Sequence, residues 1–297
     1  MTGELAGLGA ALCWAYNAVF FGKAGKRIGS FTVSHIRMWI ALPFLILLHL
    51  LFAGAPLSLV SGSSWFYLGL SGFIGFFLGD ILLFEAFVLL GPRLTMLIMS
   101  LAPVIGTALS RLMLNEKPSP LELIAIITAA GAVGWVVSEK KKKENGEEEP
   151  HELKGLLFAL GGALGQALGM VLSKMGMADG LSVITSNLIR AIFGLSAFFL
   201  FTLLTKRFSR DIRKFIGDRR AALYTSTSTF IGPVLGVILA LYAVKTIFVG
   251  VALTLTSLSP IILIPVAHFI DKEKITLRSL TGTLIALGAV SLFFFIN

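Results

Sequence analysis

Long apolar segments separated by short polar ones run along the whole chain. A helix needs roughly 20 mostly apolar residues to cross the hydrocarbon core of a bilayer. Ten segments of about that length are found, at 4–22, 32–53, 65–87, 94–113, 119–138, 153–173, 181–205, 221–244, 247–270 and 277–296. The pattern therefore predicts an all-α integral membrane protein with ten transmembrane helices.

The composition supports a membrane protein. Hydrophobic residues make up 56% of the chain, charged residues only 14%, and the mean hydropathy is +0.89. A soluble domain of this size needs more charge to cover its surface. The net charge of +9 does not indicate a nucleic-acid partner, because Lys and Arg gather between the apolar segments. The expected partners are the lipid bilayer and a small-molecule substrate, not nucleic acid.

The second half of the chain repeats the first. When the sequence is shifted by 157 residues, Phe73-Ile74-Gly75 falls on Phe230-Ile231-Gly232, and Ser100-Leu101-Ala102-Pro103 falls on Ser257-Leu258-Ser259-Pro260. Nineteen identities occur between positions 73 and 133 in this register. The identities predict a tandem duplication, with one five-helix repeat at 1–138, a charged linker at 139–152 and a second repeat at 153–297.

Five spans per repeat, an odd number, predict that the two repeats enter the membrane in opposite directions. Inverted repeats of this kind are typical of secondary transporters, whose binding site lies near the midplane between the repeats. The loops after the first, third, fifth, seventh and ninth spans hold nineteen Lys and Arg, and the loops on the other side hold four. The positive-inside rule then predicts a protein of the cell (inner) membrane whose basic loops lie in the cytoplasm and whose two termini lie on the outer side.

Asp80 is the most informative polar residue, because it lies inside the third predicted span. A carboxylate at this depth costs about 2.5–3.5 kcal/mol on insertion scales, so it should face a cavity or a partner. It could couple transport to protons or bind a cation, or it could form an ion pair with Arg37 or Arg190. Glu85 lies nearer the membrane edge and is a second candidate for coupling, although snorkelling to the interface is the simpler interpretation. Arg190 and Arg37 could each clamp an anionic group of a substrate.

The fourth and ninth spans are interrupted at matching places by Pro103 and Pro260. Paired interruptions of corresponding segments are a good sequence indicator of a transport site, and they suggest gating kinks. The alternative is a purely structural kink. Buried amides, hydroxyls and aromatic rings can recognise a polar solute. The remaining substrate-binding candidates, chosen on that ground, are Trp14, Tyr16, Asn17, Met99, Ser100, Gln166, Tyr242 and Ser257.

Motifs of known enzymes and cofactor sites do not occur in the chain. The sequence has no G-x-S-x-G, H-E-x-x-H, P-loop or Cys-x-x-Cys motif, and its four histidines are scattered. Cys13 is the single cysteine and is expected to pack in the core. The glycines at 161, 165 and 169 are expected to form a close helix-packing face. We therefore expect no catalytic residues, no metal and no cofactor.

The chain resembles the EamA-type branch of the drug/metabolite transporter superfamily. The resemblance rests on the five-plus-five spans, the Cys-Trp-Ala-Tyr-Asn stretch around Trp14, and the Ser-Leu-x-Pro motif followed by Glu-Lys in each half. It implies a secondary transporter that moves a small polar or amphipathic metabolite, with an amino-acid-like solute favoured, by alternating access as a monomer or homodimer. Coupling to protons, and a lipid-handling role as a flippase or membrane-embedded enzyme, are open alternatives.

Overall fold

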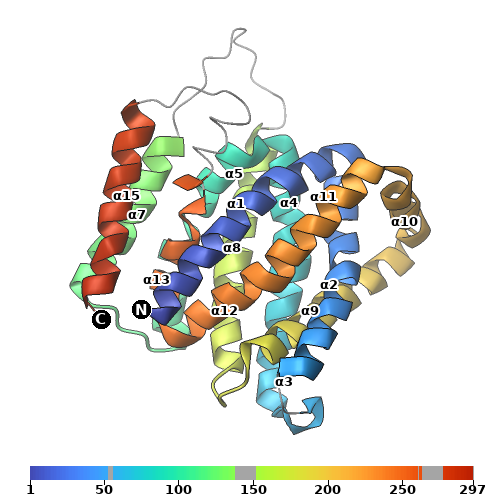
Figure 1. The fold of residues 1–297 in the computed structure, drawn as a ribbon, viewed down its shortest axis with the longest axis horizontal. Coiled ribbons are helices and arrows are strands. Elements are labelled where there is room, and N and C mark those ends of the chain that lie inside the picture. Colours follow the sequence, from blue (N-terminus) through green and yellow to red (C-terminus); the bar gives the residue numbers. More distant parts are fainter. Residues whose placement is uncertain (53–55, 138–151, 260, 263–276, 297) are drawn as a thin grey trace.

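The computed structural model describes residues 1–52, 56–137, 152–259, 261–262 and 277–296, and these residues form helices and turns (Figure 1). The α-helices are α1 (Thr2–Ile28), α2 (Ser30–Phe52), α3 (Gly62–Gly72), α4 (Asp80–Leu89), α5 (Gly91–Met99), α6 (Ala102–Met113), α7 (Pro120–Val137), α8 (Glu152–Gly176), α9 (Val183–Leu204), α10 (Phe208–Gly217), α11 (Arg219–Thr229), α12 (Val237–Thr246), α13 (Val249–Thr256) and α15 (Leu277–Ile296). A short 3₁₀ turn, η1, spans Leu57–Leu59.

Within the described ranges, six helices are long and apolar enough to cross a membrane, and they make the chain a multi-pass membrane protein. They are Thr2–Ile28, Ser30–Phe52, Gly62–Leu89, Leu153–Gly176, Val183–Leu204 and Arg219–Thr246. Two shorter apolar helices, Pro120–Ala132 and Leu280–Ala289, fall within predicted spans. The count of ten spans in two repeats stays a prediction.

Two of the long helices contain a π-helical segment in the middle. The segments are η2 (Phe73–Gly79), between α3 and α4, and η3 (Phe230–Gly236), between α11 and α12. The N–H of Asp80 donates to the carbonyl of Gly75, five residues back, and the N–H of Val237 donates to that of Gly232. The two segments are 157 residues apart, the register of the sequence repeat. π-Helical turns are rare and frequently occur at functional sites.

Helix α8 packs closely on η2 through its glycines. A Cβ added at Gly165 would lie 2.9 Å from the Cα of Gly79, and one added at Gly169 would lie 3.4 Å from the Cα of Gly75. Glycines let two helix backbones approach this closely because they carry no side chain. The predicted packing face on this helix is confirmed.

The predicted fourth span is two helices rather than one. Helix α5 ends at Met99, a turn at Ser100–Leu101 follows, and α6 begins at Ala102. Pro103 occupies the first turn of α6, where its missing N–H costs no hydrogen bond, so it starts a helix rather than kinking one. In the second half, α13 ends at Thr256, and Pro260 lies outside the described residues.

The bundle has two ends that differ in charge. We call the end where α1 finishes and α10 lies the basic end, because Lys206–Arg220 holds seven Lys and Arg. There the Arg27 guanidinium pairs with Asp218 at 2.7 Å. At the opposite end, where α8 finishes and α13 begins, Lys174 pairs with Glu116 at 2.6 Å. Each pair joins a residue before the linker to a residue after it.

Candidate functional site

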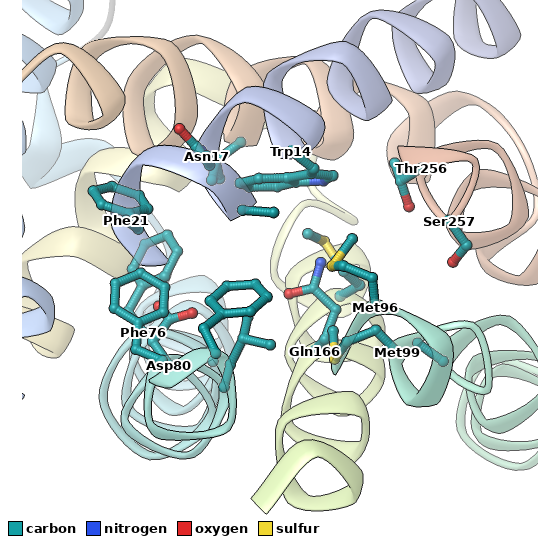
Figure 2. Close-up of a pocket in the computed structure, with 18 of the residues that line it drawn as sticks. Trp14, Asn17, Phe21, Phe76, Asp80, Met96, Met99, Gln166, Thr256 and Ser257 are labelled. Carbon is teal, nitrogen blue, oxygen red and sulfur yellow. The ribbon is translucent and has the colours of Figure 1, made fainter. Parts of the chain in front are cut away.

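A central cavity of about 80 Å³ lies between helices from both halves of the chain (Figure 2). A single water needs about 10–15 Å³ on such a measure, so the cavity has room for several waters or the polar part of a solute. Its lining residues are Trp14, Asn17, Ala18, Phe21, Arg37, Gly75, Phe76, Asp80, Leu83, Phe84, Phe87, Met96, Met99, Ser100, Ala102, Gln166, Met170, Arg190, Val237, Leu253, Thr256 and Ser257.

Three charged residues meet on one side of the cavity. Asp80 forms an ion pair with Arg37, which is 3% exposed, and Arg190, on α9, is 2% exposed. The Phe76 ring contacts both cations, with its centroid 4.5 Å from the guanidinium carbon of Arg190 and 5.7 Å from that of Arg37. Rings at this range attract a cation through their negatively charged face. Helices α2, α4 and α9, which carry Arg37, Asp80 and Arg190, therefore hold two positive charges beside one negative charge.

Several hydrogen-bond donors at the cavity have no partner among the described residues. They are Nε and Nη1 of Arg190, Nε of Arg37, the indole Nε1 of Trp14 and the amide Nδ2 of Asn17. Buried polar groups are paired in the great majority of cases, and an unpaired buried charge is especially costly. Since Asp80 already pairs with Arg37, the Arg190 guanidinium is the group with the largest unsatisfied capacity. The described lining is thus rich in donors and carries an excess positive charge.

The other walls combine aromatic rings with a few neutral polar groups. Phe21, Phe84 and Met96 form an apolar wall beside the charged cluster. Figure 2 shows the Trp14 ring above the cavity and the amide of Gln166 directed toward it from below. Small-molecule sites have this character, with mostly apolar walls and a few polar groups that fix orientation. The arrangement suits a solute with one polar end and one apolar end.

Most of the predicted site residues line the cavity. They are Trp14, Asn17, Asp80, Met99, Ser100, Gln166, Arg190 and Ser257. Asn17 contributes from the edge, because its amide packs against Gly232 of η3.

Three predicted residues lie outside the cavity lining. Tyr16 follows Trp14 by two residues, so it points about 200° around α1, and its hydroxyl donates to Thr227 at 3.3 Å. Glu85 accepts a hydrogen bond from Ser30. Tyr242 is 37% exposed, and its hydroxyl donates to Thr2 at 3.4 Å.

The cavity also contains residues that sequence reasoning did not assign to the site. Arg37, which the sequence offered as a partner of Asp80 or as a clamp for an anionic group, pairs with Asp80 and also lines the cavity. Phe21, Phe76, Met96 and Thr256 gave no signal, because an apolar or small residue inside an apolar span has no distinguishing pattern. Only their neighbours in space identify them.

The opposite end is closed by direct contacts between the two halves. A Cβ added at Gly106 of α6 would meet the Leu253 side chain of α13, and one at Gly250 would meet Thr107. Beyond these contacts, Glu116 accepts the N–H of Val249 at 2.9 Å, in addition to its ion pair with Lys174. The first turn of α13 is therefore held against α6 and α8.

Toward the basic end, the cavity continues further along its helices. Phe87 lies two residues before the end of α4, and Phe21 lies in the last third of α1. At the opposite end, the described lining stops at residues such as Leu253, four residues after the start of α13, and Met170, six residues before the end of α8. The cavity thus extends from the middle of the bundle toward the basic end.

A helical membrane protein with a central cavity, charged on one side and closed at one end, has the architecture of a solute carrier. Comparisons with known proteins agree. The EamA-like transporter family matches residues 1–138 and 153–295, so the chain belongs to that family and is a membrane transporter. A similar protein of Archaeoglobus fulgidus, described as an uncharacterized transporter, is 26% identical over 289 residues, which cover 97% of this chain and 96% of that protein.

A solved structure shares the fold. It is titled only "Crystal structure of protein", and it matches with a TM-score of 0.73 at 17% sequence identity over 100% of this chain and 97% of the other. At this identity the likeness speaks for the fold alone. None of these comparisons names a substrate, so the cargo has to be argued from the cavity.

Proposed function

We propose that the protein is a secondary active transporter for a small amphipathic metabolite that carries a carboxylate, such as an amino-acid-like solute. The observation that carries this proposal is the buried Arg190 guanidinium, which lines the cavity and leaves two of its nitrogens without a hydrogen-bond partner among the described residues. The planar guanidinium fork matches a carboxylate with two parallel hydrogen bonds.

The charge balance favours an anionic group over a cationic one. Arg37 is neutralised by Asp80, whereas Arg190 shares that one carboxylate only at longer range. A buried cation without its own counter-ion costs several kcal/mol, and a carboxylate brought by the substrate would remove that cost. The apolar part of the solute would pack against Phe21, Phe84 and Trp14.

The difference between the two ends of the cavity supports alternating access. In this conformation the cavity extends toward the basic end, which the positive-inside rule places in the cytoplasm, so we assign an inward-facing state. The transition would separate α6 from α13 and break the pair of Glu116 with Lys174. The discontinuity between α5 and α6, next to Ser100 and Pro103, supplies a hinge, because the regular helical hydrogen-bond pattern is already interrupted there.

Asp80 is the group that we assign to proton coupling. Its carboxylate holds Arg37, so adding a proton to it would release that guanidinium and change the charge presented to the substrate. Glu85 is the weaker candidate, because its carboxylate lies outside the cavity lining and accepts a hydrogen bond from Ser30.

The test is flux of labelled carboxylate solutes into proteoliposomes, with and without an imposed pH gradient. Arg190→Lys keeps the charge but loses the fork, and we expect it to weaken binding by about 10- to 100-fold, since charge-assisted hydrogen bonds contribute about 1.5–3 kcal/mol. Asp80→Asn should transport without responding to the gradient. Glu85→Gln is the matched control and should behave like the wild type.

The outcomes separate the parts of this proposal. Equal flux in wild type and Asp80→Asn under the gradient would remove proton coupling and leave a facilitator or exchanger. Equal affinity in wild type and Arg190→Lys would refute the carboxylate clamp. If no soluble solute moves while the protein stays folded, phospholipid translocation in the same vesicles is the next assay, because a lipid-handling role would then remain.

A further inference from the structure

Helix α10 is a short amphipathic helix at the basic end, between the end of α9 and the start of α11 (Figure 1). Its sequence places Phe208, Asp211 and Phe215 on one face, at spacings of three and four residues. The face around the other side carries Arg210, Arg213 and Lys214. The helix therefore has one side that packs and one side that is strongly cationic.

Asp211 fastens the packing side of α10 to the membrane-spanning helix α2. Its carboxylate is 0% exposed, accepts the Thr32 hydroxyl at 2.9 Å and lies 3.2 Å from Nδ1 of His35. Trp39 donates to the other ring nitrogen of His35 at 2.9 Å, which directs the Nδ1 proton at Asp211. Burial raises the pKa of Asp211, but the hydrogen bonds from His35 and Thr32 outweigh it and bring the pKa below its usual value. The helix is thus held in a fixed orientation.

That orientation exposes a row of cations. Five residues surround a surface hollow on the outer side of α10, namely Lys206, Ser209, Arg210, Arg213 and Lys214, and all but Ser209 are cationic. All five are exposed. We call them the basic stripe. The two acids of the same segment are both engaged elsewhere, since Asp211 faces α2 and Asp218 pairs with Arg27. No carboxylate among the described lining residues of the hollow offsets the charge of the stripe.

Exposed apolar side chains lie next to the basic stripe. Ile216 is 73% exposed and follows Arg213 by three residues, so the two share a face of α10. Leu203 and Leu204, at the end of the spanning helix α9, are 51% and 75% exposed. Apolar side chains beside a cationic helix face are typical of helices that lie at the boundary between head groups and acyl chains.

We propose that the basic stripe binds the head group of an anionic phospholipid. The phosphodiester would lie in the hollow and accept hydrogen bonds from Arg210, Arg213 and Lys214, while Ile216 and Leu204 contact the acyl chains. Basic pockets at the membrane boundary and polybasic segments next to spanning helices recognise anionic lipids in this way. The site is separate from the central cavity, and the inference does not depend on the cargo.

The position of the basic stripe at the membrane boundary favours a lipid over a free anion. Lys214 also donates to the carbonyl of Ile28, at 3.4 Å, so the stripe lies where α1 leaves the bilayer. A soluble phosphate would use the cations but gain nothing from the exposed Ile216 and Leu204. A phospholipid uses both, because its charge and its acyl chains are covalently joined.

The experiment is a titration of the purified full-length protein in neutral detergent with phosphatidylglycerol, followed by native mass spectrometry. Phosphatidylcholine and inorganic phosphate serve as separate arms. The test variant is Arg210→Gln with Arg213→Gln and Lys214→Gln. The control variant is Lys23→Gln with Lys26→Gln and Lys154→Gln, which removes three exposed cations from the same end outside the stripe.

We expect phosphatidylglycerol to bind the wild type and the control alike, and the test variant about 100-fold more weakly at low ionic strength, by the usual contribution of each surface cation. A variant with Arg210→Lys and Arg213→Lys keeps the charge and should retain most of the binding. This variant also remains informative if the test variant fails to fold.

Three results would overturn the proposal. Equal loss in the test and control variants would mean that only the overall charge matters. Equal affinity for phosphatidylcholine would mean that the charge is not recognised. If inorganic phosphate displaced phosphatidylglycerol at comparable concentration, the site would take a soluble anion and the lipid assignment would fail.

Discussion

Gly72 is the position where one added methyl group should disturb the cavity most. It is the last residue of α3, and a Cβ built there would lie 2.8 Å from both the Cα and the carbonyl carbon of Arg190, with the carbonyl oxygen closer still. The obstacle is backbone, so no side-chain rotation can relieve it. Restoring a contact of 3.4 Å to the two carbon atoms alone requires α3 and α9 to separate by about 0.6 Å, the difference between 3.4 and 2.8, and the closer carbonyl oxygen requires more.

The cost of Gly72→Ala follows from that separation. Forcing extra volume into a packed interior costs typically about 1–3 kcal/mol. The shift also carries Arg190 away from Asp80 and Phe76, so we expect about 10-fold weaker binding of the carboxylate solute. Gly131→Ala is the matched control, because Gly131 is exposed on α7 and a Cβ there meets nothing within 4 Å. Alanine in that helix should be neutral or stabilising by up to about 1 kcal/mol.

The assay is thermal unfolding of both variants in the same detergent, together with solute binding. Gly72→Ala should lower the melting temperature by several degrees, while Gly131→Ala should leave it unchanged or raise it. If Gly72→Ala melts with the wild type and binds equally well, then α3 and α9 are not packed as described, and the argument for a preorganised Arg190 is wrong.

Three further predictions concern other parts of the molecule. Glu116→Gln keeps an acceptor for the N–H of Val249 but loses the charge opposite Lys174. In a protein without Cys13, a Leu253→Cys probe should then react about fivefold faster with an impermeant thiol reagent added on the side opposite the basic end. An unchanged rate would mean that the pair of Glu116 with Lys174 does not help to close that end. Phe76→Leu removes a ring from beside both arginines and should weaken solute binding by about two- to fivefold, measured by equilibrium binding. Because the pKa of Asp211 is depressed in the folded protein, its contribution to stability is present above about pH 4, the unfolded value, and is lost as the pH falls through the lower folded value. Limited proteolysis along an acid titration should therefore show release of α10 only below about pH 4, and Asp211→Asn should show no such pH-dependent step.

Hydrophobic pattern alone locates most of the long helices to within a few residues, although α1 ends at Ile28, six residues beyond the predicted 4–22. The predicted segment 181–205 is Val183–Leu204, and the predicted 32–53 is Ser30–Phe52. The rule behind this success is simple, since a bilayer accepts only segments that satisfy their own backbone hydrogen bonds. The same rule says nothing about irregular backbone inside a span, so the seven-residue π segments and the break at Ser100 were not predicted as such.

Charge located the polar side of the cavity, because Asp80 and Arg190 are conspicuous inside apolar spans. The aromatic walls could not be found in the same way, since Phe84 looks like any other phenylalanine in a lipid-facing run. Tyr16 lies outside the cavity lining for a geometric reason, because the exact rotation of α1 decides which side chains next to Trp14 face inward. Helix α10 was treated only as part of a basic loop, because its apolar positions are too few to suggest a helix without the packing on α2.

The two π segments have a consequence for how this protein tolerates change. Each accommodates about one more residue than an α-helix of the same length would, and Asp80 comes directly after the first of them. Deleting one residue of this segment that does not line the cavity, such as Ile74, would therefore let the turn become ordinary helix and leave everything beyond it in nearly the same orientation. Asp80, Leu83 and Phe87 would then stay at the cavity. A deletion in the regular helix that follows, such as Ile81, would instead rotate the residues beyond it by about 100° and take Leu83 and Phe87 out of the lining. A library of single deletions would thus identify the π segments as the stretches that tolerate the loss of a residue.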